Sequence, residues 1–386
     1  MRRLVLTTTA LAASALLIAG CATTVTTPAA ETTTSTSASE TVTTSTVDTS
    51  NSSGDIDWSA LPTTEVTLTD EGLTITEAGT YVLSGSTTGQ IIVNADGNVR
   101  IILNGVTIAS SEGAAIQVDE AETTVIELAD GTTNTVSDAS TRADEEIDGA
   151  IYSSDDLIIT GTGTLDVTAN FADGIVGKDD LWIESGTITV TSVDDGIRGK
   201  DSLTISGGTI TIDAQGDGMK STNDTDAGEG QLVISGGDIT ITTGDDAVKA
   251  EQQVTITGGT LDIVSSVEGI EAPVIVIDGG TISVNASDDG INAAASEIVT
   301  SGLKITINGG DITIVMGSGD TDAIDSNGDL AITGGTIDIT AQSATDFDGT
   351  GTFTGGTLIV NGTQVTTLSQ SMGGGMGGGM GGGGRP

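Results

Sequence analysis

Histidine is absent from this 386-residue chain, and only 11 lysine and arginine residues stand against 55 aspartate and glutamate residues, for a formal net charge of −44. Without histidine, the chain lacks the most common general base and the most common zinc ligand. Nucleic acid and anionic lipid surfaces repel a chain this acidic, so we expect no nucleic-acid partner. Aromatic residues make up 2% of the chain, which leaves few rings for stacking on sugars.

Cysteine occurs once, at Cys21, so no intrachain disulfide can form. Arg2 and Arg3 precede an apolar stretch, Leu4 to Ile18, that is too short for a comfortable membrane span. The stretch ends in Ile-Ala-Gly-Cys, which resembles a bacterial lipobox. That resemblance implies cleavage before Cys21, lipidation of its thiol, and display of the protein on the extracellular face of the cell membrane. The alternative is an ordinary signal peptide with an incidental cysteine.

Composition divides the chain into five segments. We expect a lipoprotein signal peptide at residues 1–20 and a lipid-anchored tether rich in threonine and serine at 21–62. Strands of irregular spacing predict an N-terminal cap and irregular coils at 63–147, followed by regular coils at 148–365. The glycine- and methionine-rich residues 366–386 have the composition of a flexible tail.

The regular segment repeats one unit, typified by Asp194 to Gly218. The unit contains an acidic residue before a glycine, a short strand that ends at a glycine pair, and a second short strand. Nine copies follow one another at steps near 22 residues, too short for a helix and two buried strands together. The sequence therefore predicts an all-β, right-handed, single-stranded parallel β-helix, present as a monomer.

Stacking of the coils places the acidic residue before each turn glycine (or its alanine replacement) in a column with a spacing of about 4.8 Å. Carboxylates that close repel each other by roughly 1 kcal/mol in a water-like dielectric. Backbone N–H groups at the turns, nearby basic side chains or bound calcium could each offset this repulsion. The predicted column contains Asp148, Asp173, Asp195, Asp217, Asp246, Glu268, Asp289, Asp322 and Asp348.

Basic residues gather in one band beside this column, at Arg198, Lys220 and Lys249, with Lys178 and Lys200 two positions further on. Acidic residues are densest in an insertion after Lys220 and in two later Asp-x-Asp turns, which we expect to bring four carboxylates together in adjacent coils. Calcium takes six to eight oxygen ligands of this kind. The candidate Ca²⁺ ligands are Asp195, Asp217, Asp224, Asp226, Glu229, Asp246, Asp289, Asp320, Asp322, Asp346 and Asp348.

Several segments occur in a fixed order: TEAGTYVLSGSTTGQIIV, VRIILNGVTI, DDLIITGTGTLDV, DGIVGKDDLWI and DDGIRGKDSLTISGGTITI. Over about residues 63–360 they resemble the bacterial carbohydrate-binding β-helix family whose members bind cellulose and pectin-type acidic sugars. The resemblance implies a fold similar to that of pectate lyase, calcium ions between coils, and binding without cleavage. Later coils depart from the Asp-Gly-Ile signature, as in Asp246-Ala247-Val248 and Asp322-Ala323-Ile324.

The function expected from these features is polysaccharide binding, with an acidic or cellulosic glycan as the partner and no catalysis. Arg198, Lys200, Lys220 and Lys249 are the candidate carbohydrate-binding residues, together with Trp182 as the one outward-facing aromatic candidate. The first alternative is a calcium-dependent polysaccharide lyase in which Lys220 or Lys249 is the base. The second is a structural or adhesive surface protein, and the fold alone does not decide among the three.

Overall fold

A computed structural model describes residues 52–318 and 321–369. The predicted signal peptide, most of the tether with Cys21, Asp320 and nearly all of the tail lie outside the described residues. Within the described ranges, no helix has the length and apolar character needed to span a membrane.

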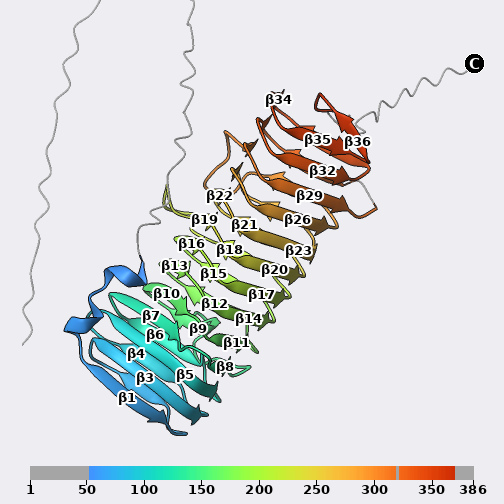
Figure 1. Cartoon of the computed structure of the whole chain (residues 1–386). Coiled ribbons are helices and arrows are strands. Elements are labelled where there is room, and N and C mark those ends of the chain that lie inside the picture. The colour runs from blue at the N-terminus through green and yellow to red at the C-terminus, as the bar shows by residue number, and fades with distance from the viewer. Residues whose placement is uncertain (1–51, 319–320, 370–386) are drawn as a thin grey trace, which may run out of the picture. The chain divides into compact units, whose positions relative to one another are not determined.

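Two short 3-10 turns, η1 (Ser53–Asp55) and η2 (Trp58–Ala60), are followed by strands in two sheets (Figure 1). Sheet A has 24 strands and sheet B has 12, and successive coils pair in parallel. At the C-terminal end, β35 (Thr357–Val360) and β36 (Thr363–Val365) pair antiparallel. The prediction of an all-β parallel β-helix is confirmed.

Each regular coil contributes one strand to sheet B and two to sheet A. The strands of sheet B are β2 (Leu73–Ile75), β4 (Ile91–Asn94), β6 (Ile116–Glu120), β9 (Gly149–Ser153), β12 (Asp173–Gly177), β15 (Ile197–Gly199), β18 (Met219–Ser221), β21 (Val248–Ala250), β24 (Ile270–Glu271), β27 (Ile291–Ala293), β30 (Asp322–Ser326) and β33 (Ser343–Phe347). The first strands of sheet A are β1 (Thr63–Leu68), β3 (Gly79–Thr87) and β5 (Val99–Ala109), and β5 is long enough to pair with both β7 and β8 of the next coil.

From that coil onward, sheet A has two rows of strands. The first row contains β7 (Thr123–Leu128), β10 (Asp156–Gly161), β13 (Asp180–Ile183), β16 (Ser202–Ile205), β19 (Gln231–Ile234), β22 (Gln253–Ile256), β25 (Val274–Ile277), β28 (Lys304–Ile307), β31 (Asp329–Ile332) and β34 (Gly351–Phe353). The second contains β8 (Thr133–Ser137), β11 (Thr164–Thr168), β14 (Thr187–Ser192), β17 (Thr209–Ala214), β20 (Asp238–Thr243), β23 (Thr260–Ser266), β26 (Thr281–Ala286), β29 (Asp311–Met316), β32 (Thr336–Thr340) and β35.

The core is a stack of identical positions from successive coils. Ile188, Ile210 and Ile239 are direct strand partners, and each is at most 1% exposed. Each such side chain contributes about 1.5–3 kcal/mol through burial, which explains why period-2 alternation sets the register. Gly208 turns the chain between β16 and β17 with φ of +94°, a left-handed conformation in which a side chain is strained.

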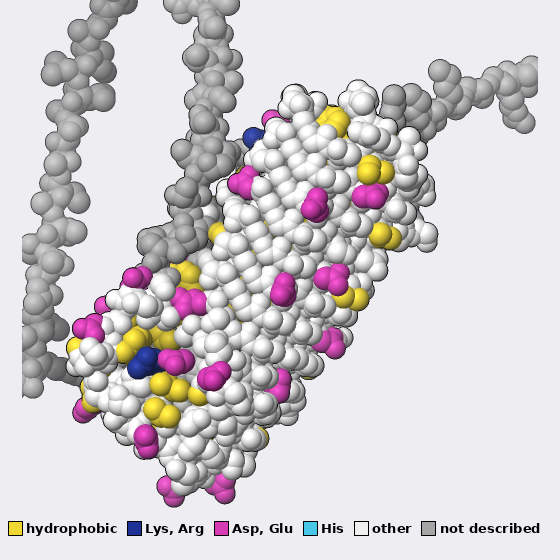
Figure 2. All heavy atoms as spheres, in the orientation of Figure 1, with side chains coloured by type: hydrophobic (Ala, Val, Ile, Leu, Met, Phe, Trp, Pro, Cys, Tyr) yellow, Lys and Arg dark blue, Asp and Glu magenta, His cyan; other side chains and the backbone are white. Residues whose placement is uncertain are grey.

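The outward positions of the second row of sheet A carry mainly threonine and aspartate, as in the partners Thr189 and Thr211. Figure 2 shows a surface that is largely uncharged, with separate acidic side chains spaced along it. The ladder is continuous across residue 148, because β9 pairs in parallel with both β6 and β12.

Residues 52–61, here called the strap, lie across the outer face of sheet A. Ile56 and Trp58 pack on a buried cluster formed by Val125, Ile158 and Trp182. Ser52 Oγ and the Ser53 backbone N–H both donate to Glu184 Oε1, each at 2.9 Å, and the Arg100 guanidinium lies 5.0 Å from the centre of the Trp58 ring. The described chain therefore enters the fold on the sheet A side.

Candidate functional site

Seven acidic residues stack as predicted beside sheet B. Each lies two residues before a strand position that pairs with its counterpart in the next coil, as Ile197 pairs with Met219 and Met219 with Val248. These residues, here called the acidic column, are Asp173, Asp195, Asp217, Asp246, Glu268, Asp289 and Asp322.

Backbone hydrogen bonds run along the acidic column. The N–H of Asp195 donates to Asp173 Oδ1 at 3.1 Å, the N–H of Asp217 to Asp195 Oδ1 at 2.8 Å, and the N–H of Asp246 to Asp217 Oδ1 at 3.0 Å. The N–H of Asp322 donates in the same way to Asp289 at 3.0 Å. Each carboxylate thus satisfies a backbone donor of the next coil, which offsets part of the repulsion within the column.

The predicted column is wrong at both ends. Asp173 pairs with Gly149 rather than with Asp148, because one extra residue separates Asp148 from the strand position that follows it. At the other end Asp322 pairs with Ser343, and Asp346 pairs with Asp325. The expected alignment of the two Asp-x-Asp turns is therefore wrong as well, and Asp348 falls outside the column.

The basic band lies on the outer face of sheet B, where Arg198, Lys220 and Lys249 pair directly with one another. Each cation contacts carboxylates of two coils. Arg198 Nη2 lies 2.6 Å from Asp173 Oδ2 and also contacts Asp148. Lys220 Nζ lies 2.7 Å from Asp217 Oδ2 and 3.6 Å from Asp195 Oδ2.

Lys249 completes this pattern, because its Nζ lies 2.6 Å from Asp246 Oδ2 and 2.8 Å from Glu271 Oε1. Burial lowers the pKa of Lys249, but its hydrogen bonds to Asp246 and Glu271 and their charges raise it well above the usual value. The pKa of Lys220 is also raised, chiefly because Asp217 outweighs the effect of burial. Lys200, by contrast, is 42% exposed at its side chain and pairs with Asp201 at 3.1 Å.

Beyond Lys249 the same outward positions change character. The strand partners continue through Glu271 and Asn292 to Asp325 and Asp346. We call the whole series the outer row of sheet B: Arg198, Lys220, Lys249, Glu271, Asn292, Asp325 and Asp346. Burial, followed by neighbouring acidic charge, raises the pKa of Asp325 to about 6, and burial also raises that of Asp289 to about 6.

Within the described residues, the insertion after Lys220 does not bring Asp224 or Asp226 to Asp217, where the sequence predicts a calcium site. Asp224 and Asp226 are exposed and Glu229 is half-buried. Asn223 orders the loop, since its Oδ1 accepts the N–H groups of Thr225 and Asp226 at 3.0 and 2.9 Å. Among the described residues, Asp217 groups with Asp245 and Asp246, and not with Asp224 or Asp226.

Two further acidic groups have ligand oxygens within 4.8 Å of one another. One contains Asp246, Glu268 and Glu271. This group and the Asp217 group already hold ammonium groups, those of Lys249 and Lys220. Burial raises the pKa of Glu268, and Glu271 adds to this through its hydrogen bond and its charge.

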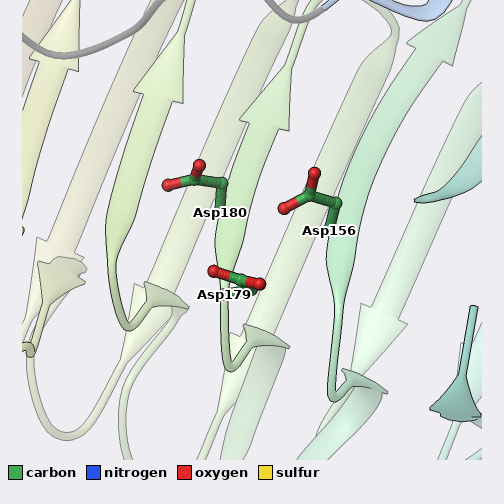
Figure 3. A group of neighbouring side chains, drawn as sticks. All are labelled: Asp156, Asp179 and Asp180. Carbon is green, nitrogen blue, oxygen red and sulfur yellow. The ribbon is translucent and has the colours of Figure 1, made fainter. Parts of the chain in front are cut away.

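The other group, which the sequence interpretation missed, contains Asp156, Asp179 and Asp180 (Figure 3). Asp156 and Asp180 are the first residues of neighbouring strands, and the Asp156 carboxylate points toward the strand that carries Asp180. Burial, then the charges of Asp180 and Asp179, raise the pKa of Asp156 to about 7. The sequence Asp-Asp-Leu, which occurs at residues 155–157 and again at 179–181, is the signal that indicates this group.

Trp182 is not available as an exposed sugar-stacking ring. It is 3% exposed, beneath Ile56 and Trp58 of the strap. The prediction that Trp182 faces solvent is wrong because the strap, which has no counterpart in the repeat, covers that part of sheet A.

Grooves lie over the outer face of sheet B near the N-terminal end and further along the stack. The N-terminal groove, of about 460 Å³, runs between Gln90, Gln117 and loop residues 141–147, and a neighbouring one of about 260 Å³ extends it over Thr74 and Ile92. Arg142 anchors this loop, since its guanidinium donates to the carbonyls of Ala139 and Ile147, each at 2.7 Å.

The second groove, of about 420 Å³, lies where β21 and β24 meet the loop after β27. It is lined by Lys249, Ala250, Glu251, Glu271, Pro273, Ala294, Ala295, Ser296 and Glu297. Of the predicted carbohydrate-binding residues, the structure therefore places Lys249 in a groove, whereas Arg198 and Lys220 lie in the outer row between the two grooves.

Comparison with known proteins identifies the class. A family model described as carbohydrate-binding domain-containing protein matches residues 69–320 and 266–373, so the chain belongs to this family. A carbohydrate-binding domain-containing protein of Acetivibrio thermocellus is 38% identical over 133 residues, which cover 32% of this chain and 46% of that relative. The matched part of the chain thus spans less than half of the relative's length.

Among solved structures, a polysaccharide lyase-like protein from C. thermocellum, studied as a gadolinium derivative, is similar to this chain. The two are 26% identical, with a TM-score of 0.41, and the match covers 79% of this chain and 90% of the other.

Proposed function

We propose that this protein binds an extended polysaccharide along the outer face of sheet B and does not cleave it. The observation that carries the proposal is the pair of loop-walled groove regions on this face, joined by the outer row. From β6 to β24 is six coil steps, about 29 Å at about 4.8 Å per step, which is the length of several sugar units. On sheet A, the strap covers the outer face of β7, β10 and β13.

The N-terminal groove has the chemistry of a sugar site. Gln90, Gln117 and Glu112 offer amide and carboxylate groups for sugar hydroxyls, and the half-buried Ile92 and Leu73 offer apolar surface. Concave sites with some apolar lining and a few convergent polar groups are typical ligand sites.

Binding is favoured over lyase chemistry by the state of the two candidate bases. Lys220 and Lys249 each contact two carboxylates, and their raised pKa values keep both protonated. A protonated amine has no lone pair with which to remove a proton from a sugar carbon.

Calcium and the lipid anchor belong to the same proposal. Asp156, Asp179 and Asp180 each have a carboxylate oxygen within 4.8 Å of the others, which suits a hard divalent cation, and an ion there would offset the burial and the acidic charges that raise the pKa of Asp156. Lipidation of Cys21 would anchor the protein on the extracellular face of the membrane.

Retention on insoluble cellulose and on immobilised polygalacturonate, with calcium and with chelator, tests the proposal. We expect retention on at least one polysaccharide and no ultraviolet absorbance from unsaturated uronate products. The pair Thr74→Ala/Gln117→Ala should weaken retention about fivefold by removing groove hydrogen bonds, while Thr189→Ala/Thr211→Ala on sheet A should not. Unsaturated products would establish the lyase alternative, and no retention on any polysaccharide would reject the function.

A further inference from the structure

The strap covers a row of outward-facing side chains on the first strands of sheet A. Val125, Ile158 and Trp182 are direct strand partners in successive coils, and Ile56 and Trp58 pack over them. An indole ring and two aliphatic side chains in one row form a compact apolar surface on the exterior of the sheet. Apolar surface gathered in this way is typical of an interaction site.

Two polar atoms in the same row lack hydrogen-bond partners. Trp182 and Thr204 are direct strand partners, and each is 3% exposed. Among the described residues, neither Trp182 Nε1 nor Thr204 Oγ1 has a hydrogen-bond partner, although both atoms are buried. Buried polar groups are rarely left in this state. A donor and a hydroxyl in adjacent coils therefore offer hydrogen bonds that the strap does not satisfy.

The strap is attached by side chains and not by strand pairing. Its backbone hydrogen bonds stay within the strap, as from the Leu61 N–H to the Trp58 carbonyl at 3.2 Å. In the described part of the chain, its hydrogen bonds to the rest of the fold all end on Glu184, which accepts from Ser52 Oγ and the Ser53 N–H at 2.9 Å and from Ser53 Oγ. A segment with so few backbone bonds to its neighbours opens locally at low cost in free energy.

The strap presents to this face the same kinds of group that a sugar presents. Its two serine hydroxyls donate to Glu184, and Ile56 and Trp58 place apolar surface on Trp182. A sugar unit has hydroxyls at its rim and C–H groups on its face. It also has oxygens that can accept a hydrogen bond from the Trp182 indole N–H, which the strap does not provide.

We propose that the strap is a removable cover over a second sugar-binding site on sheet A, formed by Trp182, Thr204 and Glu184. When the strap lifts, a sugar ring stacks on the indole, its hydroxyls donate to the Glu184 carboxylate, and its oxygens pair with Trp182 Nε1 and the Thr204 hydroxyl. The site takes a neutral glycan, because a uronate would place a second carboxylate beside Glu184. This site goes beyond the binding proposed for sheet B and lies on the other sheet, so either can fail alone.

Tryptophan fluorescence tests whether the strap lifts. The chain has two tryptophans, so Trp58→Phe leaves Trp182 as the only one and makes a reporter of this site. Acrylamide should quench Trp182 weakly in the full-length reporter, because the ring is buried. Adding Ser52→Ala/Ser53→Ala/Ile56→Ala removes hydrogen bonds to Glu184 and apolar packing, and should raise the quenching at least twofold. Equal quenching in the reporter and this loosened reporter would show a fixed cover and overturn the inference.

A matched control and a titration identify the ligand. Val264→Ala/Ser287→Ala/Ser301→Ala changes the same residue types at exposed positions elsewhere and should leave the quenching of Trp182 unchanged. Cellohexaose and xylohexaose should protect Trp182 from acrylamide, with apparent affinity about tenfold higher in the loosened reporter, because only the open fraction binds. Exposure of Trp182 without protection by either oligosaccharide would reject a sugar site under the strap.

Thr204 gives a readout that a purely structural role would not move. In the loosened reporter, Thr204→Val should weaken oligosaccharide binding about fivefold, yet it should not lower the melting temperature, because the hydroxyl has no partner in the closed form. Thr306→Val, further along the same row, should change neither. Thr74→Ala/Gln117→Ala should leave the Trp182 signal intact, so loss of that signal and loss of binding on sheet B are distinguishable. A melting temperature lowered by Thr204→Val, with binding unchanged, would overturn the role of Thr204.

Discussion

The two halves of the outer row of sheet B have the same strand arrangement, but only the first half carries positively charged side chains. Over β15, β18 and β21 the row supplies Arg198, Lys220 and Lys249, each in contact with carboxylates of two coils. Over β27, β30 and β33 the row supplies Asn292, Asp325 and Asp346. The acidic column continues from the first half as far as Asp322 in the second, so the repeat specifies the carboxylates but not the cations beside them.

This difference separates two ways of stabilising the same acidic column. In the first half the protein carries its own counter-charges, and backbone N–H groups complete the arrangement. Burial raises the pKa of Asp289 and Asp325 to about 6 in the second half, and it also raises that of Asp246 to about 6 and that of Asp173 to about 7 in the first half, so the halves differ in their basic side chains and not in this shift. A proton, a metal ion or a cationic ligand would each supply what the side chains there do not.

The largest effect should follow removal of an internal cation from the first half. Arg198→Met leaves Asp173 buried without its ion pair, because the Arg198 side chain is 14% exposed and Asp173 is 4% exposed. We expect a loss of about 3 to 5 kcal/mol in the free energy of unfolding, measured by denaturant titration. Lys304→Met, at an exposed position, is the matched control and should change it by about 0.5 kcal/mol or less. Equal effects for the two would contradict an internal role for the basic band.

Calcium should have the next largest effect, through the group formed by Asp156, Asp179 and Asp180. An ion that binds only the native state stabilises it by about 2.7 kcal/mol at a hundredfold excess over Kd. The melting temperature should rise with calcium in the native protein and much less in Asp156→Asn/Asp179→Asn. Asp224→Asn/Asp226→Asn, in the exposed insertion, should keep the full rise. A rise that the insertion variant abolishes would restore the cluster predicted from sequence.

The pH dependence of stability should reveal the raised pKa values of the carboxylates in the second half. The pKa values of Asp289 and Asp325 are raised from 3.8 to about 6, so their contribution to stability is fully present below 3.8 and is lost as pH rises through 6. Asp289→Asn/Asp325→Asn should therefore melt higher than the native protein at neutral pH, by about 2–4 °C, and equally at low pH. Thermal melts across this window provide the check, and a gap that widened at low pH would reverse the assigned sign.

The sequence predicted the middle of the site better than its ends. Between Asp173 and Asp322 the turn residue keeps one spacing to the next strand, so the column could be counted from the sequence. A single extra residue after Asp148 shifts that acid out of register, and a slip of one residue turns a side chain to another face. The prediction that Trp182 faces solvent is wrong for a different reason, because the strap that covers Trp182 is distant in sequence and lies outside the repeat.

The groove beside β24 was also beyond sequence reasoning, because a long insertion between β27 and β28 builds one wall of it. The sequence predicts Lys249 as a binding residue. Its ion pairs with Asp246 and Glu271, which keep it protonated, depend on how the coils stack. The sequence shows which side chains of a coil are charged, whereas the carboxylate that neutralises such a charge can come from another coil.

The smallest effect should come from a substitution that adds a positively charged side chain to the second half of the outer row. Asn292→Lys places an ammonium two coils beyond Lys249, between Glu271 and Asp325 in the outer row. Asn292 is 6% exposed, so desolvation offsets much of the attraction, and the new ion pair should stabilise the fold by only about 0.5–1 kcal/mol, seen as a higher denaturant midpoint. Asn292→Gln keeps an uncharged amide at this position and separates charge from size. If the lysine variant were no more stable than the glutamine variant, the carboxylates of the second half would need no cation beside them.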